Sequence, residues 1–311
     1  MTRALAIVAF LGAVLAVDTQ VDAPSQLLLG LASWLALALA LRGVDPLLRA
    51  QALVVVPIAT CAEIVGSIIW GVYTYRLENL PSFVPPCHGL VYLAGAAFAA
   101  HAVRHRELLV RIALVGVLGW GILGVTVLPR TDVAGALGAI LLAVYLVRGR
   151  APHVYAGVFL VVAWLELYGT AIGTWTWAVT VPGTGVPQGN PPSGVAAGYV
   201  WFDIVALAVA PRLLAYASSA AARSRRSSTR YAPTVPARLA TTTSPNANPA
   251  SIAILPPTLS GTGSACSAST VAAAHSTASP NDEKAGVPRS RSNRYANSAT
   301  AIATTTAVAP R

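Results

Sequence analysis

Two related stretches decide the fold: EIVGSIIWGVYTY at residues 63–75 and ELYGTAIGTWTW at residues 166–177. Both read Glu-x-x-Gly, and both continue as Gly-x-aromatic-x-aromatic. The likeness extends to PPCHGLVY (85–92) and PPSGVAAGY (191–199), with the register shifted by only one or two residues. Internal similarity at this distance is typical of a duplicated structural unit.

The repeat is set in long apolar segments. The chain is 55% hydrophobic and 10% charged, and its mean hydropathy is +0.63, which is outside the range of ordinary soluble domains. A bilayer-spanning helix needs roughly 17 to 25 residues. The sequence therefore predicts an all-α polytopic membrane protein with about eight transmembrane helices, at 4–18, 26–42, 52–72, 88–103, 108–128, 133–148, 154–174 and 195–215.

The two copies of the repeat occupy about 52–103 and 154–215. Because four predicted spans separate them, both copies face the same way across the membrane. This predicts two parallel four-helix halves related by an axis along the membrane normal, with a site shared between them.

Arginine placement predicts the orientation of an integral plasma membrane protein. Positive residues favour cytoplasmic loops, and most arginines fall on alternate sides of the spans, which places both the N-terminus and the C-terminus in the cytoplasm. An alternative concerns Met1 to Asp18, whose basic start and short apolar core also resemble a signal peptide. Cleavage would leave seven spans.

The chain divides at about residue 216 into a membrane domain (1–216) and a tail (217–311). The first part holds 11 Arg against 9 acidic residues, whereas the tail holds 9 Arg and Lys284 against 2 acidic residues. The tail is rich in Ser, Thr, Ala, Pro and Arg, and such a segment predicts disorder. Its arginines lack interleaved aromatic residues, so we predict no nucleic acid as a partner. Arg223, Arg225 and Arg226, next to the last predicted span, could contact anionic membrane lipid, and the alternative is a positive cluster that sets the topology.

No sequence pattern predicts a cofactor. The three cysteines show no paired spacing, no His, Cys or acidic cluster has the spacing of a metal site, and nucleotide-binding glycine motifs are missing from the sequence. We therefore predict no metal and no cofactor. The sequence indicates no oligomeric state.

Glu63 and Glu166 lie near the middle of the third and seventh predicted spans. An ionisable group at this depth costs roughly 2.5 to 3.5 kcal/mol on insertion scales, so both should face the bundle interior. Gly66 and Gly169 follow three residues later and predict close helix packing beside each acid. Two interpretations stay open: an interhelical hydrogen bond that holds the halves together, or a catalytic or transport role.

Asp203 is a third candidate catalytic residue. It lies in the last predicted span and has no counterpart in the first copy. A buried neutral carboxylic acid can donate a proton, whereas an ionised neighbour can stabilise a cation. Glu63, Glu166 and Asp203 together could divide these roles.

The aromatic pairs Tyr73 and Tyr75, and Trp175 and Trp177, follow the two glutamates at the outer ends of their helices. Aromatic residues at such positions often form interfacial belts. The alternative is a substrate-binding role in which their π faces stabilise a carbocation. Further aromatic candidates lie nearer to the acids in depth: Trp70, Trp164, Tyr168 and Trp201.

His88 and Asn190 occupy similar places after the Val-Pro of each copy, at the start of the next helix. Both are candidates for substrate contact. The alternative for His88 is an ordinary interfacial position.

The stretch Gly173 to Asn190, GTWTWAVTVPGTGVPQGN, resembles the G-x-W-x-W…G-V-P-x-x-N motif of bacterial carotenoid hydratases of the CruF type. EIVGSIIWGVYTYRLENLPSFVP is similar to that family's earlier Glu…Gly…Gly-x-Tyr-x-Tyr…Val-Pro stretch. Heterodimer-type lycopene cyclases resemble the chain more distantly. The likeness covers about 160 residues of the membrane domain and none of the tail.

The resemblance implies acid-initiated chemistry on a terminal double bond of a hydrophobic isoprenoid. A carboxylic acid protonates the alkene, a tertiary carbocation forms, and water captures it. We therefore expect a membrane enzyme of carotenoid or isoprenoid metabolism. The alternative, motivated by the duplication and the acids, is a proton-coupled transporter or permease; a third is a structural subunit of another membrane protein.

Overall fold

The computed structural model describes residues 1–230, and residues 231–311, most of the predicted tail, lie outside the described part. Within residues 1–230, eight α-helices lie over the eight predicted apolar runs. They are α1 (Thr2–Asp18), α2 (Ala23–Ala40), α3 (Pro46–Glu63), α4 (Val84–His101), α5 (Arg106–Thr126), α6 (Val133–Arg148), α7 (Pro152–Ala171) and α8 (Ala196–Arg230). The last helix continues beyond residue 216, where the membrane domain was predicted to end.

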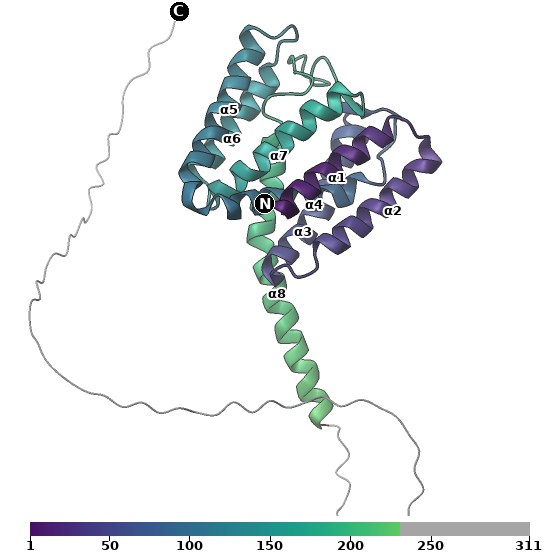
Figure 1. Ribbon diagram of the computed structural model, residues 1–311, viewed down its shortest axis with the longest axis vertical. Helices are drawn as coiled ribbons and strands as arrows, with labels where there is room; N and C mark the ends of the chain where they lie inside the picture. Colours follow the sequence, from purple (N-terminus) through teal and green to yellow (C-terminus); the bar gives the residue numbers. More distant parts are fainter. Residues whose placement is uncertain (231–311) are drawn as a thin grey trace, which may run out of the picture. The chain divides into compact units, whose positions relative to one another are not determined.

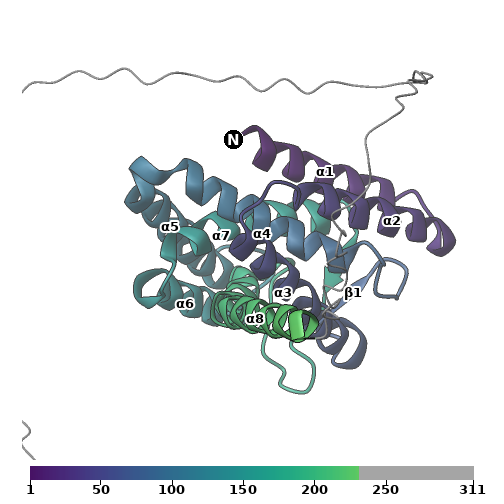
Figure 2. The ribbon, with the colours of Figure 1, turned by 90° about the horizontal axis from the view of Figure 1, so that it is seen from below.

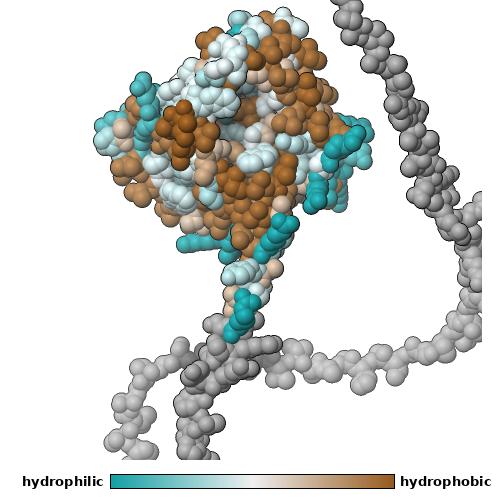
Figure 3. All heavy atoms as spheres, turned by 180° about the vertical axis from the view of Figure 1, so that it is seen from behind, coloured by the Kyte–Doolittle hydropathy of each residue, from teal (hydrophilic) through white to brown (hydrophobic). Residues whose placement is uncertain are grey.

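Five helical segments are long and apolar enough to cross a membrane by length and composition: 23–40, 46–69, 103–126, 152–171 and 196–221. The helix α6 is apolar but shorter. Apolar side chains cover much of the surface of the helical part in Figure 3. Large hydrophobic residues that are more than half exposed, such as Leu28, Val115 and Leu137, are unfavourable in water and favourable against lipid.

The helices α4 and α7 lie in the middle of the bundle, and α3 and α8 pack on them and on each other (Figures 1 and 2). The helix α4 packs against α7, and α8 packs against α3, so each of these contacts joins the two copies of the repeat. In the outer layer, α2 packs on α4 and α6 packs on α8. These pairs make equivalent contacts in the two halves, whereas α1 packs on α4 and α7 and α5 packs on α6 and α7.

The helix α1 is an integral part of this packing. It contacts α4 and α7, and its Leu11 and Leu15 are buried. Its Gly12 lies against the Trp164 ring, and the buried Asp18 at its end accepts a hydrogen bond from Gln26 (2.6 Å). These contacts make α1 a part of the helix bundle.

Two short strands interrupt the predicted all-helical pattern. The aromatic motifs form β1 (Tyr73–Tyr75) and β2 (Trp175–Trp177), which pair antiparallel. The helices end a few residues before the predicted ends of the spans at 52–72 and 154–174. The reason is that Gly71 (φ 72°) and Gly173 (φ 81°) take the left-handed conformation, which turns the chain out of the helix.

Aspartates cap three helices. Asp22 accepts from the Ser25 amide at the start of α2, and Asp45 caps α3 in the same way. The hydrogen bond to Ser25 lowers the pKa of the exposed Asp22 carboxyl. Asp132 caps α6 through the Gly135 amide and is buried.

Asp132 also anchors the segment that leads into α8. Its two oxygens accept from the amides of Gly189 and Ser193, each at 2.6 Å, in addition to Gly135 at 3.0 Å. One carboxylate therefore joins α6 to the chain between β2 and α8.

We expect Asp132→Ala to lower the free energy of unfolding by about 3 kcal/mol or more, since three buried amides lose their acceptor. The matched change at an exposed cap, Asp22→Ala, should cost about 1 kcal/mol. Thermal unfolding of the purified protein in detergent measures both. Equal losses would contradict the anchoring role of Asp132.

Candidate functional site: two clamped glutamates in one cavity

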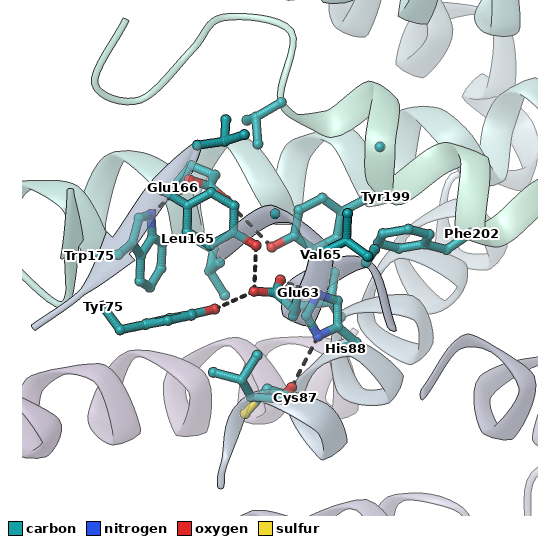
Figure 4. Close-up of a pocket in the computed structure, with 18 of the residues that line it drawn as sticks. Glu63, Val65, Tyr75, Cys87, His88, Leu165, Glu166, Trp175, Tyr199 and Phe202 are labelled. Carbon is teal, nitrogen blue, oxygen red and sulfur yellow. Dashed lines mark hydrogen bonds and ion pairs between the residues drawn. The ribbon is translucent and has the colours of Figure 1, made fainter. Parts of the chain in front are cut away.

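A cavity of about 740 Å³ lies between the two copies of the repeat. Its walls come from α1, α3, α4, α7, α8 and the aromatic strands, and nearly all lining side chains are apolar or aromatic. Glu63 and Glu166 both line it (Figure 4). The volume is within the roughly 300 to 1,000 Å³ of typical small-molecule pockets.

The two strands set the geometry of this site. Tyr73 pairs with Trp177, Thr74 with Thr176, and Tyr75 with Trp175. Thr74 and Thr176 are also equivalent in the sequence repeat, so the ladder is centred on equivalent residues. The ladder is thus locally two-fold symmetric and holds each aromatic pair beside the other.

Glu63 is clamped by the aromatic pair of its own copy. The hydroxyls of Tyr73 and Tyr75 each donate to Glu63 Oε2, both at 2.6 Å. The carboxylate is 8% exposed. Burial and the adjacent Glu63 raise the pKa of both phenols, so their hydroxyls remain protonated donors.

Glu166 is clamped in the equivalent way by its own pair. The indole N–H groups of Trp175 and Trp177 donate to Glu166 Oε2 at 3.0 and 3.3 Å. This carboxylate is 3% exposed. The sequence pattern Glu…Gly-x-aromatic-x-aromatic is therefore one hydrogen-bonded unit in each copy.

The second oxygen of each glutamate faces a residue of the helix that follows. His88 Nε2 lies 3.2 Å from Glu63 Oε1, and the Tyr199 hydroxyl donates to Glu166 Oε1 at 3.4 Å. The His88 and Tyr199 rings stack on each other, with centroids 5.2 Å apart and planes inclined by 20°. His88 and Tyr199 thus make equivalent contacts in the two copies.

A proton on either His88 Nε2 or Glu63 Oε1 would make their 3.2 Å approach favourable. His88 Nδ1 faces the Val84 carbonyl at 3.1 Å, and a carbonyl only accepts, so this nitrogen is the donor. The pair is then either an imidazolium with a carboxylate, or a neutral imidazole that accepts from a carboxylic acid.

The glycines beside the acids make room for the aromatic clamps. A Cβ atom on Gly66 would lie 3.2 Å from the Tyr73 ring, and one on Gly169 would overlap the Trp175 ring. Both glycines are closely packed, but the packed partner is the aromatic ring of the same copy and not another helix.

A π-helix accounts for the register shift between the copies. The segment η1 (Ile64–Ile69) continues α3 with wider turns, and the first copy has one more residue than the second between its two motif glycines. The Val72 amide donates to the Gly66 carbonyl, and the equivalent Thr174 amide donates to the Gly169 carbonyl. The wider helix absorbs the additional residue while the clamp is kept.

The other residues predicted for the site differ in whether they line the cavity. Asp203 is 2% exposed on α8 and is outside the cavity lining. Asn190 also lies outside the lining, where its side chain accepts from the Trp177 amide. Of the additional aromatic candidates, Trp70 and Trp201 line the cavity, whereas Trp164 and Tyr168 stack on each other elsewhere.

Sequence reasoning missed Tyr199 as a contact of Glu166 and Arg130 as a support of the strands. The Arg130 guanidinium donates to the carbonyls of Gln188 (2.7 Å), Trp177 (2.8 Å) and Ala178. Gln188 in turn donates to the Val72 carbonyl (2.9 Å). The repeat aligns Tyr199 with Tyr92 and not with His88, so the sequence alignment carried no signal for the contact of Tyr199 with Glu166.

No family model matches the chain, and no curated protein or solved structure matches it.

The glycines provide a test of the clamps. Gly169→Ala should displace Trp175 and cost about 1 to 3 kcal/mol of stability, as in overpacked cores. Gly66→Ala should be nearly neutral, because the Tyr73 ring needs to move by only a few tenths of an ångström. Thermal unfolding and tryptophan emission of both variants measure the difference, and a larger loss for Gly66→Ala would contradict this account.

Proposed function

We propose that this protein is a membrane-embedded enzyme of carotenoid or isoprenoid metabolism that performs acid-initiated chemistry, hydration above all, on a double bond of a hydrophobic substrate. The observation that carries the proposal is the pair of buried carboxylates, each held by three polar side chains, in an otherwise apolar cavity. The resemblance to carotenoid hydratases points to the same chemistry.

The membrane arrangement is part of the proposal. All eight helices cross the bilayer as two parallel four-helix halves, with both termini cytoplasmic. The supporting observations are the exposed apolar side chains, the equivalent packing of α4 on α7 and α8 on α3, and the symmetric ladder between the copies.

Glu166 is the proton donor in this mechanism. Indole N–H groups can only donate, so Trp175 and Trp177 hold Oε2 of Glu166 as an acceptor. The proton of the carboxylic acid must then reside on Oε1, whose one partner, Tyr199, is distant at 3.4 Å. This oxygen is the atom available to a substrate.

Glu63 stabilises the positive charge that follows. Two tyrosine hydroxyls and His88 surround it, an arrangement that favours a carboxylate paired with an imidazolium. The aromatic rings add their π faces to this cation-stabilising environment, since cations are attracted to ring faces within about 6 Å. This is the substrate-binding role considered for the aromatic pairs.

The chemical step balances without a cofactor. The Glu166 O–H bond breaks as the alkene π electrons form a new C–H bond, and the adjacent carbon becomes a tertiary carbocation. A water oxygen bonds to this carbon and releases a proton, which returns to the Glu166 carboxylate. The net change is the addition of one water molecule, and the acid is regenerated.

Glu166→Gln should reduce conversion by about 10² to 10⁴-fold, the usual contribution of a general acid. The assay is pigment analysis in a carotenoid-producing host that expresses equal amounts of each variant. The control is Glu107→Gln, the same chemical change at an exposed residue paired only with Arg111, which should leave conversion unchanged. Wild-type conversion by both Glu63→Gln and Glu166→Gln would exclude acid catalysis by these residues.

The transporter alternative predicts proton-coupled uptake into proteoliposomes and no chemical change in any lipid. Alternating access requires the halves to move against each other. Backbone hydrogen bonds of the β1 and β2 ladder join the two copies at one end of the cavity, and this favours the enzyme.

A further inference from the structure

The cavity reaches the protein surface on one side only. Six lining residues are exposed, and all six belong to α3, η1 or α8 or directly follow η1: Pro57, Cys61, Val65, Trp70, Gly198 and Trp201. The lining residues from α1, α4 and α7 are buried or half-buried. The cavity therefore has a mouth between α3 with η1 on one side and α8 on the other.

This mouth carries no charged residue. Val65, Trp70 and Trp201 are 49 to 50% exposed, and the neighbouring Ile68 and Ile69 are exposed as well. Both sides of the mouth lie on helical segments that are long and apolar enough to span a membrane. An apolar rim on membrane-spanning helices faces hydrocarbon rather than water.

The end of the cavity beside the strands is closed by polar contacts. The Trp70 indole donates to the Pro182 carbonyl (3.0 Å), and Gln188 donates to the Val72 carbonyl. The Arg130 guanidinium donates to the carbonyls of Trp177, at the end of β2, and Gln188, and so joins β2 to the segment that contains Gln188. Entry past the strands would require several of these bonds to break.

Gly198 lies at the mouth and leaves space there. No heavy atom lies within 4 Å of the position that a Cβ atom would occupy on Gly198. Its neighbour Tyr199 contacts Glu166. A gap in the α8 surface thus lies next to the proposed proton donor.

We propose that the opening framed by Trp70, Gly198 and Trp201 is a lateral port through which the end of a long apolar chain enters from the bilayer. The inference rests on the proposed function and adds the substrate class to it. The occupant is a linear hydrocarbon chain whose terminal double bond reaches Glu166 while the remainder stays in lipid. A charged substrate would be disfavoured on this path, because the mouth carries no charged residue.

The test uses the full-length protein in lipid nanodiscs and a linear C20 isoprenoid hydrocarbon with a diazirine at one end. After photolysis, mass spectrometry locates the labelled peptides, and competition with unlabelled hydrocarbon identifies the saturable label. We expect saturable labelling in the segments 61–70 and 195–202. Labelling confined to the strands and the loop after β2 would overturn the port.

Gly198→Leu should reduce the saturable labelling at least tenfold, because its side chain fills the gap. The matched control is Gly119→Leu, since Gly119 is a helical glycine of α5 with equally open space and no part in the cavity. Leucine favours helix more than glycine does, so both variants should fold. Labelling of Gly198→Leu at the level of Gly119→Leu would refute the port.

Different experimental outcomes would contradict the lateral port and the proposed acid mechanism. Saturable labelling that depends on Gly198, together with full conversion by Glu166→Gln, would keep the port and remove the acid mechanism. Loss of conversion by Glu166→Gln, together with labelling unaffected at Gly198, would keep the mechanism and remove the port.

Discussion

The hydrogen bonds between each buried glutamate and the aromatic pair that follows it are the constraint on which the structure depends. A carboxylate inside an apolar bundle is costly unless polar partners surround it. Tyr73 and Tyr75 meet this requirement for Glu63, and the two indoles meet it for Glu166. To provide these partners, the chain must leave the helix and turn back, which explains the glycine before each strand.

The turn back also joins the two copies. When both aromatic segments fold toward their acids, they meet each other and pair as β1 and β2 in a register centred on Thr74 and Thr176. The strands therefore have two roles: they position the aromatic hydrogen-bond donors beside the glutamates, and they hold the two halves together. The π-helix η1 is the local adjustment that preserves this register despite the additional residue in the first copy.

The helices and the importance of the two glutamates could be predicted from the sequence, because apolar length and the cost of buried charge are local signals. The strands could not be predicted, since three-residue aromatic segments have the same composition as interfacial belts. Tyr199 was missed for a different reason. Its role depends on where α8 begins relative to α4, and helix starts are poorly fixed by hydropathy alone.

Asp203 is a residue for which the sequence predicted a place in the site that the structure does not show. Like the glutamates, it is an acid within a predicted span, but it lies outside the cavity lining, and one of its oxygens lacks a hydrogen-bond partner among the described residues. Depth in a span does not determine which face of the helix a residue occupies relative to its neighbours.

The two copies differ in the hydrogen-bond donors that surround their glutamates. Tyrosine hydroxyls and histidine can donate, accept and exchange protons, whereas indole N–H groups only donate. The first copy can therefore adapt to a change in the charge of Glu63, and the second holds one oxygen of Glu166 fixed and leaves the other available. In the proposed mechanism, unequal donors on a symmetric scaffold distinguish a proton-delivering carboxyl group from a charge-stabilising one, although both belong to the same sequence motif.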